Sequence, residues 1–403
     1  MKICLVRLPS PYLINEKAFP PLGLLAMATV LKHSGHEVVV HDGSMEDIPP
    51  GFEAYGLGPS VTEYGYARTA LDIIRRSTPS ARVVIGGPHA TLNLAECVRD
   101  GFDCVVSGDG EPVVTEAFSN PGAVIRSGGE SSDLDEFPIT DRSFINLSDY
   151  EYLINSRPAA PIVTSKGCPF NCGFCSRVYK RVRMRSARHV IKEIDYLQRD
   201  LGYGAVMFFD DTFVVDRRRV IAIASHLKRL GMLWRCLVRG DLIVKYGSDF
   251  AQMLSDHGCV EVGMGIESGS DRILKIIGKR EDTGTIRSAI DLLKSHGIRV
   301  KGFFIIGLPG EDADTLAETA RFVESSGLDD MDFSIFKPYA GSRIHAHREE
   351  YDIDWDPMDY SLTFYKGDGR EAGGNIRTSK LSNAEIVSAM YAMEEKYKPA
   401  GWR

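Results

Sequence analysis

The sequence predicts an α/β protein with a doubly wound parallel sheet at its N-terminus, then a partial (β/α)6 barrel of the TIM type, and a short α-rich C-terminal tail. Apolar runs of strand length alternate with helix-length segments over residues 1–125, and a second alternating series of six units occupies residues 158–345. Strands separated by helices are typical of parallel sheets that are covered on both faces. Six units are fewer than the eight of a complete barrel.

The composition is that of an ordinary globular protein. Of 403 residues, 43% are hydrophobic and 26% are charged, and the net charge is −7, which argues against a disordered, collagenous or coiled-coil chain. No apolar run approaches the roughly 18 residues of a membrane span, and the start MKICLVRLPS fits a first strand better than a signal peptide. We therefore expect a cytoplasmic protein without membrane association. The acidic balance argues against a nucleic-acid partner.

The first domain is predicted to span residues 1–125. Its strands are expected at 2–8, 37–43, 53–61, 81–88 and 103–106, and its helices at 20–36 and 63–77. The loops after these strands hold Pro9–Pro21, Gly58–Thr62, Gly86–Thr91 and Gly108–Glu111. Because such sheets bind ligands at the carboxyl ends of their strands, these loops are the candidate binding site. Residues 126–157 lose the periodicity and gain Ser, Asp and Gly, as linkers between domains do.

The second domain is predicted to span residues 158–345. Its six strands are expected at 161–167, 205–210, 234–239, 260–266, 300–307 and 332–337, and its helices near 187–201, 216–231, 246–257, 269–277, 282–297 and 312–327. The tail, 346–403, holds Trp355, Tyr360, Phe364 and Tyr365, a glycine-rich stretch at 367–374, and a helix opened by the capping box Ser382–Glu385. We expect this tail either to cap the active site or to cover the open edge of the barrel.

Three of the eight cysteines lie within eight residues, in Cys168-Pro-Phe-Asn-Cys172-Gly-Phe-Cys175. This C-x3-C-x2-C loop follows the first barrel strand, where barrel enzymes carry their chemistry. Three thiolates can hold three irons of a [4Fe–4S] cluster and leave the fourth open to chelate a substrate. A structural zinc normally takes four protein ligands, and no further Cys or His occurs before His189. The alternative is a zinc loop or a chance cluster of cysteines.

This motif, with an aromatic residue before its last cysteine, resembles that of the radical S-adenosylmethionine family. Five further segments match the family in order: Asp210–Phe213, Arg239–Leu242, Gly265–Gly269, Gly307–Glu311 and Lys337–Ser342. The resemblance covers residues 160–343 and implies a [4Fe–4S] cluster and bound S-adenosylmethionine. It implies S-adenosylmethionine contacts from Phe174, Asp210, Asp211, Arg239, Glu267, Ser268, Gly307 and Pro309. Each has a structural alternative, because acidic residues also cap helices and glycines also make turns.

The first domain resembles the Rossmann-like cobalamin-binding domain that often precedes this barrel, and Leu134–Pro138 resembles the family linker. The resemblance implies cobalamin contacts from Leu22, Gly23, Ser60, Val61, Thr62, Gly86, Gly87, His89, Ala90, Gly108 and Glu111. Glycine would let the backbone approach a large planar ring. The D-x-H-x-x-G motif that supplies a cobalt-binding histidine elsewhere is absent, so we expect cobalamin in a base-off state without a protein histidine ligand. The alternative is a domain that kept the fold and lost the cofactor.

The two resemblances together imply a C-methyltransferase. In such enzymes a 5′-deoxyadenosyl radical made from S-adenosylmethionine abstracts a substrate hydrogen, and methylcobalamin then donates a methyl group to the carbon radical. The expected partners are a small-molecule substrate and a low-potential ferredoxin or flavodoxin. The basic run Arg177–Arg188 is best interpreted as a solvated face that also offsets the negative charge of the cluster. Its alternatives are a docking surface for an acidic electron donor and a pocket for an anionic substrate. The alternatives are an enzyme that cyclises or rearranges its substrate without methylation, a tRNA methylthiotransferase-like enzyme, and a non-catalytic iron–sulfur protein.

Overall fold

The computed structural model describes residues 1–10, 13, 15–120, 122–127, 133–179, 181–356 and 375–398. These residues form two compact units. The first contains residues 1–152, and the second contains the described residues from 153 onward. Within the described residues, no helix combines the length and the apolar character that crossing a membrane requires.

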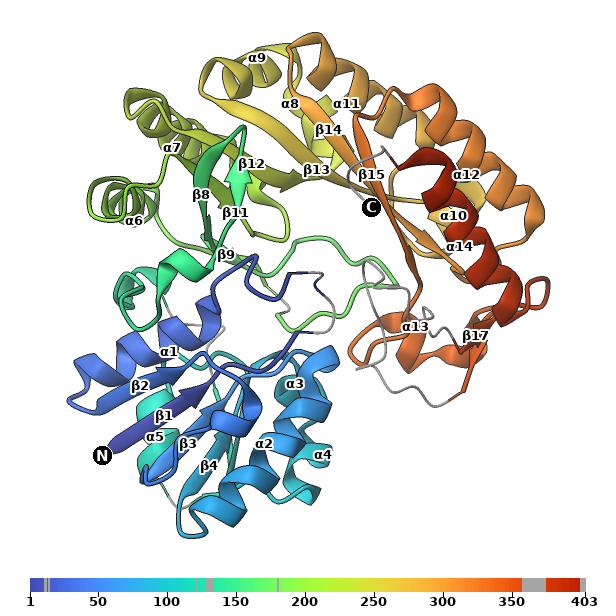
Figure 1. The fold of residues 1–403 in the computed structure, drawn as a ribbon. Coiled ribbons are helices and arrows are strands. Elements are labelled where there is room, and N and C mark those ends of the chain that lie inside the picture. The colour runs from blue at the N-terminus through green and yellow to red at the C-terminus, as the bar shows by residue number, and fades with distance from the viewer. Residues whose placement is uncertain are drawn as a thin grey trace. The chain divides into compact units, whose positions relative to one another are not determined.

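The first unit is a six-stranded, all-parallel sheet (Figure 1). Its strands are β1 (Lys2–Val6), β2 (Glu37–His41), β3 (Ala54–Leu57), β4 (Arg82–Ile85), β5 (Cys104–Ser107) and β6 (Val124–Arg126), in the order β2-β1-β3-β4-β5-β6. Its helices are α1 (Leu22–His33), α2 (Tyr64–Ser77), α3 (Gly87–Leu92), α4 (Leu94–Arg99) and α5 (Val114–Ser119). The five predicted strands are therefore present, the first four of them shorter, and β6 is an additional strand. The third ends at Leu57, before a turn at Val61–Glu63, and the fourth ends at Ile85 because Gly87, with φ +83°, begins a helix.

Alternate residues of β1 face opposite cores, which explains why the whole strand is apolar. Ile3 and Leu5 pack with α1 and α5, whereas Cys4 and Val6 pack with α2. Helices thus cover both faces of the sheet, as the doubly wound prediction requires. The chain reverses its direction of winding between β1 and β3, so the carboxyl ends of these two strands mark the topological switch point.

Part of the segment expected to be a linker packs on the first unit. The Asp141 backbone N–H donates to Thr29 Oγ1 at 3.0 Å, and the Asp141 carboxylate pairs with Lys32 at 2.9 Å. Farther along, Tyr150 donates its hydroxyl to Asp42 at 2.7 Å. The segment packs on a unit whose six-stranded sheet is already complete at Arg126, and it contributes no long helix or strand. It therefore lacks strand or helix periodicity.

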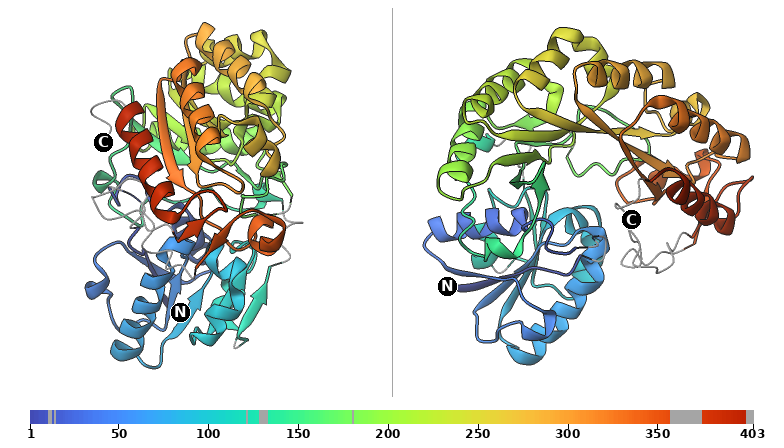
Figure 2. Two further views of the ribbon diagram at one scale, coloured as in Figure 1. Left: turned by 90° about the vertical axis from the view of Figure 1, so that its right-hand side faces the viewer. Right: turned by 45° about the horizontal axis from the view of Figure 1, so that its top comes forward.

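The second unit is a curved sheet whose helices lie along its outer face (Figure 2). Its strands are β7 (Leu153–Ile154), β8 (Arg157–Ile162), β11 (Ala205–Phe208), β12 (Leu233–Val238), β13 (Cys259–Glu267), β14 (Arg299–Ile306) and β15 (Asp330–Ile335). The last six are parallel neighbours in chain order, as a partial (β/α)6 barrel requires. The short β7 adds one antiparallel edge strand that the sequence did not indicate.

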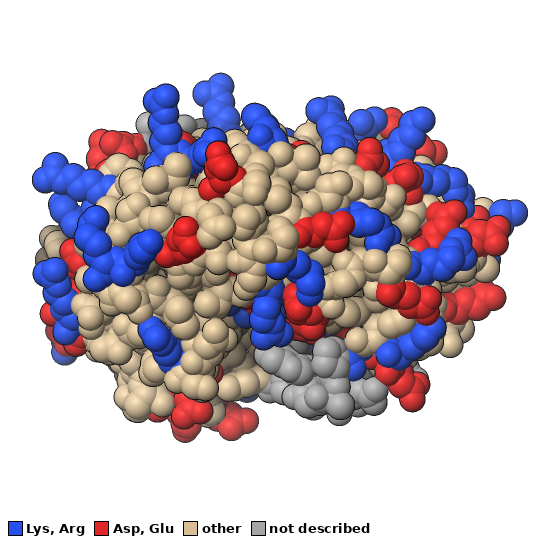
Figure 3. Space-filling model, turned by 90° about the horizontal axis from the view of Figure 1, so that it is seen from above, with Lys and Arg blue, Asp and Glu red and all other residues tan. Residues whose placement is uncertain are grey.

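The helices of this unit follow the predicted alternation. They are α6 (Ala187–Arg199), α7 (Arg217–Arg229), α8 (Gly240–Tyr246), α9 (Ser248–Asp256), α10 (Asp271–Ile276), α11 (Thr283–Ser295) and α12 (Ala313–Ser326). On the face drawn in Figure 3, basic and acidic side chains are interspersed. The apolar face of β13, with Val262, Met264 and Ile266, belongs to the core beneath the helices. The opposite face carries Glu261, two glycines and Glu267 toward the inside of the barrel.

The described part of the tail covers the edge strand β15. After α13 (Arg343–Ala346), β16 (Asp354–Trp355) pairs with β17 (Ile376–Arg377), and α14 (Asn383–Tyr397) follows. The predicted capping box is confirmed, since Ser382 and Glu385 exchange hydrogen bonds at the start of α14. Ile386 and Met390 of α14 join the barrel core. The predicted cap residues Tyr360, Phe364 and Tyr365 and the stretch 367–374 lie outside the described residues.

Candidate active site

The cysteine loop projects from the carboxyl end of β8, between the paired short strands β9 (Ser165–Lys166) and β10 (Arg183–Met184). Both backbone polar groups of Gly173 fix the loop to its surroundings. Its N–H donates to the Ile277 carbonyl at 2.7 Å, and its carbonyl accepts from the Ile344 N–H at 3.0 Å. A third tie comes from Ser176, whose hydroxyl donates to the Ala340 carbonyl at 2.6 Å. The loop is thus held at the mouth of the barrel.

The three loop cysteines differ from the other five in their surroundings. Cys4, Cys97, Cys104, Cys236 and Cys259 are buried, whereas Cys168 and Cys172 are half-buried and Cys175 is exposed. Only the loop cysteines offer sulfur atoms for a ligand.

The number of available sulfur atoms fits a cluster better than a structural zinc ion. A structural zinc normally takes four protein ligands, whereas the loop offers the three sulfurs of Cys168, Cys172 and Cys175. A [4Fe–4S] cluster can bind three thiolates on separate irons and leave the fourth iron open.

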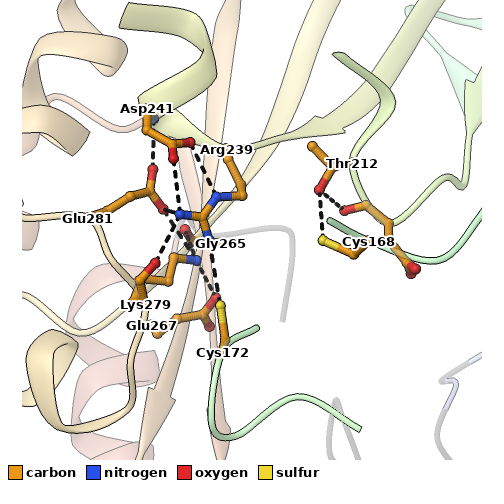
Figure 4. Close-up of polar contacts among 10 residues, drawn as sticks. Cys168, Cys172, Thr212, Arg239, Asp241, Gly265, Glu267, Lys279 and Glu281 are labelled. Carbon is orange, nitrogen blue, oxygen red and sulfur yellow. Dashed lines mark hydrogen bonds and ion pairs between the residues drawn. The ribbon is translucent and has the colours of Figure 1, made fainter. Parts of the chain in front are cut away.

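Arg239 lies next to the cysteine loop, in a buried ionic network (Figure 4). Its guanidinium donates to both carboxylate oxygens of Asp241 at 3.2 Å, to the Lys279 carbonyl at 2.9 Å, and to Cys172 Sγ at 3.6 Å. The Glu281 carboxylate lies 3.2 Å away. The Phe170 ring covers one face, with its centroid 3.7 Å from the guanidinium carbon.

The same network orients Glu267. Lys279 Nζ donates to Glu267 Oε1 and to the Gly265 carbonyl, each at 2.8 Å, and lies 3.7 Å from Glu281. Burial by itself would lower the pKa of Lys279, but the two carboxylates raise it, so the ammonium stays charged. Glu267 has φ +68°, a rare conformation for a residue with a side chain, at an irregularity in the β13–β14 register. Sequence reasoning missed Lys279 and Glu281, and the only signal was a Lys-Arg-Glu run in a short loop between helices.

The two adjacent aspartates have different environments. Asp210 is fully buried and accepts hydrogen bonds from the Thr164 N–H, the Thr164 hydroxyl and the Ser165 hydroxyl at 2.5–2.7 Å. It therefore ties β8 to β11. Asp211 is exposed at the same strand end. Of this pair, Asp211 is the one whose carboxylate can reach a ligand.

The remaining predicted S-adenosylmethionine residues are mostly enclosed. Ser268 is fully buried, with its hydroxyl 3.3 Å from Thr319 Oγ1. Gly307 has φ +85°, and a side chain there would collide with Ile376 and Ile386 of the tail. Pro309 is buried and Phe174 is half-buried against the core. The structure thus brings Arg239, Glu267 and the cysteine loop together, and it places Ser268 in a structural role.

In the first unit, the predicted cobalamin residues lie at the carboxyl edge of the sheet. Leu22 and Gly23 begin α1, and a side chain at Gly23 would meet nothing within 4 Å. Ser60, Val61 and Thr62 form a capped turn before α2, in which Glu63 accepts from the Ser60 N–H at 2.8 Å. At the next strand ends, Gly87 (φ +83°) and Gly108 (φ +96°) have conformations that favour glycine. A Cβ on Gly87 would lie 3.1 Å from the Gly58 backbone. The loops that follow β3 and β4 therefore lie against each other at these two glycines, with no side chain between them. Gly86, Ala90 and Glu111 belong to the same strand-end segments.

His89 faces the core. It is 4% exposed, stacks on the Tyr64 ring at 3.7 Å, and has Nε2 3.1 Å from Glu96. Burial lowers its pKa to about 4, so the ring is neutral near pH 7. At the same edge, His41 has Nε2 2.8 Å from the Ser44 carbonyl. Both rings are thus held by neighbouring protein groups. The base-off state of cobalamin stays a prediction.

Comparisons with known proteins match both units. The family model of the Radical SAM superfamily matches residues 162–323, and the B12 binding domain model matches residues 16–118. An uncharacterized methyltransferase of Pyrococcus horikoshii is 31% identical, over 85% of this chain and 82% of that protein. The anaerobic magnesium-protoporphyrin IX monomethyl ester cyclase of Rubrivivax gelatinosus is 25% identical, over 81% of this chain and 66% of that protein.

A solved structure shows the same fold. The radical S-adenosylmethionine methyltransferase TsrM from Kitasatospora setae, with cobalamin and a [4Fe–4S] cluster bound, gives a TM-score of 0.69 at 17% identity, over 97% of this chain and 84% of that one. The cofactors of this chain are accordingly a [4Fe–4S] cluster, S-adenosylmethionine and cobalamin. With a three-cysteine loop at the barrel mouth, glycine loops at the sheet edge, and a relative at 31% identity over most of both lengths, this chain belongs to the cobalamin-binding radical S-adenosylmethionine enzymes.

Proposed function

We propose that this enzyme transfers a methyl group to a carbon atom of a small-molecule substrate. The observation that carries the proposal is the presence in one chain of a three-cysteine loop and of a separate, glycine-lined strand edge matched by the B12 binding domain model. When bound, the cluster supplies the electron that cleaves S-adenosylmethionine, and cobalamin carries the methyl group. The methyltransferase names among its relatives favour this outcome.

The chain's own residues would hold and orient these groups. Cys168, Cys172 and Cys175 would ligate three irons and leave one open. Asp211 and Glu267 offer carboxylates at the strand ends, and Lys279 fixes the direction of Glu267. The backbone at Gly87 and the neighbouring strand-end loops would hold cobalamin without a histidine below the cobalt.

The electron donor would be an acidic ferredoxin or flavodoxin that docks on the basic run after the cysteine loop. Within that run, Arg185 pairs with Glu193 at 2.5 Å and Arg177 donates to Asn171 at 3.0 Å, so these two support the local fold. Arg181 and Arg188 are exposed and remain for a partner surface. Opposite charge at such a rim mainly raises the rate of association.

The test uses the reconstituted enzyme with cobalamin, a strong chemical reductant and S-adenosylmethionine, and it needs no substrate. A methyltransferase should produce S-adenosylhomocysteine only when cobalamin is present, because S-adenosylmethionine must methylate the reduced cofactor. It should also produce 5′-deoxyadenosine, and the triple variant Cys168→Ala, Cys172→Ala, Cys175→Ala should lose this product and its bound iron. The matched control, Cys259→Ala on the buried strand β13, should keep both products.

A cyclising enzyme is the second candidate, because a relative at 25% identity is named a cyclase. Such an enzyme would form 5′-deoxyadenosine without cobalamin-dependent S-adenosylhomocysteine. That result would replace methyl transfer by cyclisation or rearrangement as the function.

A further inference from the structure

We propose that Arg239 tunes the reduction potential of the cluster through a hydrogen bond to the sulfur of Cys172, and that it does not bind S-adenosylmethionine. This inference rests on the proposed function only in assuming that the loop holds the cluster. It assigns Arg239 a positioning and electrostatic role that differs from the ligand contact its place in the sequence suggests.

The donor geometry of Arg239 supports this assignment. A guanidinium has five N–H donors in a fixed plane. Nε donates to Asp241, and Nη2 faces Asp241 Oδ2, the Lys279 carbonyl and Glu281, all within 3.2 Å. Nη1 donates to Cys172 Sγ at 3.6 Å. Two of the three nitrogens therefore hold the group in place, and the third is directed at the ligand sulfur.

The site is enclosed, which strengthens the interaction. Arg239 is 5% exposed, and the Phe170 ring, which belongs to the cysteine loop, covers its planar face at 3.7 Å. A guanidinium stacked on an aromatic ring in this way is both attracted to it and restrained by it. Phe170, which belongs to the cysteine loop, thus helps to hold the Arg239 guanidinium against Cys172 Sγ of the same loop.

The other two sulfurs have weaker described neighbours. Cys168 Sγ lies 3.6 Å from the neutral hydroxyl of Thr212, and Cys175 Sγ lies 3.8 Å from the Ser176 carbonyl. Of the three sulfurs, Cys172 Sγ thus has a described cationic donor, Arg239 Nη1. Reduction adds negative charge to a cluster, so a cationic hydrogen-bond donor at a ligand sulfur stabilises the reduced state more than the oxidised state and raises the potential.

The test is a redox titration of the reconstituted cluster, followed by electron paramagnetic resonance, with a parallel measurement of S-adenosylmethionine affinity. Arg239→Gln should lower the equilibrium constant for reduction about tenfold, or about 59 mV for one electron, because it removes the cationic donor at Cys172 Sγ. Arg239→Lys keeps the charge and should fall between Gln and the wild type.

Arg235→Gln is the matched control. Arg235 lies four residues earlier, within β12, and pairs with Glu261 at 2.9 Å. This control should leave the potential unchanged.

The opposite result would overturn the inference: an unchanged potential in Arg239→Gln, with weakened S-adenosylmethionine binding, would make Arg239 a ligand contact. If Arg239→Gln takes up no iron, Phe170→Leu provides the same test, because it frees the guanidinium without removing its charge. A lowered potential in Phe170→Leu supports the inference and an unchanged one refutes it. A wild-type protein without any cluster would instead contradict the proposed function.

Discussion

Glu311 should make the second unit less stable as the pH rises toward neutrality. Its carboxyl is fully buried after β14, where Oε2 accepts from the Gly307 N–H at 2.5 Å. Burial raises its pKa from 4.5 to about 7. Between these two values the unfolded chain loses the proton while the native protein keeps it. The unfolded state then binds fewer protons, so the free energy of unfolding decreases with increasing pH.

The size of the effect follows from the pKa difference. Each pKa unit corresponds to about 1.4 kcal/mol, so a rise from 4.5 to about 7 corresponds to about 3 kcal/mol. This stabilisation is fully present below about pH 4.5 and is lost by about pH 7. Few exposed carboxylates would have an effect of this size or sign, since pairing usually lowers their pKa.

The assay compares urea unfolding of the wild type and Glu311→Gln between pH 5 and pH 8, followed by tryptophan fluorescence, since Trp234 is fully buried in this unit. Glutamine stays neutral and its amide oxygen can still accept from Gly307. The variant should therefore gain stability relative to the wild type as the pH rises. The control Asp314→Asn removes an exposed carboxylate from the same segment and should show no such trend. A wild-type–variant difference that is constant across this range would refute the reasoning.

Three further predictions follow from the strand ends and the tail. Asp210→Asn should lower the free energy of unfolding by about 1–3 kcal/mol, because it disturbs a buried acceptor of three hydrogen bonds. Asp211→Asn should leave stability unchanged and weaken S-adenosylmethionine binding in equilibrium dialysis. If instead Asp211→Asn destabilised the protein and Asp210→Asn weakened binding, Asp210 would be the ligand contact and Asp211 the structural residue. Gly87→Ala and Gly35→Ala each place a side chain at positive φ, costing about 1–2 kcal/mol, but only Gly87→Ala adds a close backbone contact. Only Gly87→Ala should therefore weaken cobalamin binding in a spectral titration, and equal affinities would contradict this. Deletion of 346–403 should cause aggregation, seen by light scattering, because it uncovers β15; a dispersed variant with normal product coupling would refute both the edge-cover and the cap interpretations.

The fold could be predicted because its long elements carry their own signals. The six parallel barrel strands each pack one apolar face beneath the helices, so they appear as mostly apolar runs bounded by helix-length segments. The short helices α3, α4 and α5 were not predicted, because six residues are too few for a clear helical period. Strands of two residues, such as β7, carry no period at all.

The site was less predictable, because it depends on which way adjacent side chains point. Asp210 and Asp211 are chemically identical, and only the path of the chain after β11 places one in the core and the other at the surface. In the sequence, Lys279 and Glu281 look like ordinary solvent-exposed charged residues. Only the folded barrel shows that they are buried and paired. Which sulfur Arg239 contacts likewise depends on how Gly173 of the cysteine loop binds the backbone of Ile277 and Ile344, which are far away in the sequence.

The position of α14 has a consequence for the order of folding during synthesis. The sheet of the first unit lies within residues 1–126, so this unit can fold while the ribosome is still translating the barrel. The barrel cannot cover β15 until residues 383–397 have emerged, since Ile386 and Met390 complete its core. A nascent barrel therefore exposes an unpaired strand edge for the time needed to translate the tail. Slow codons just before α14 would prolong this exposure, whereas the same codons after β6 would give the first unit time to fold.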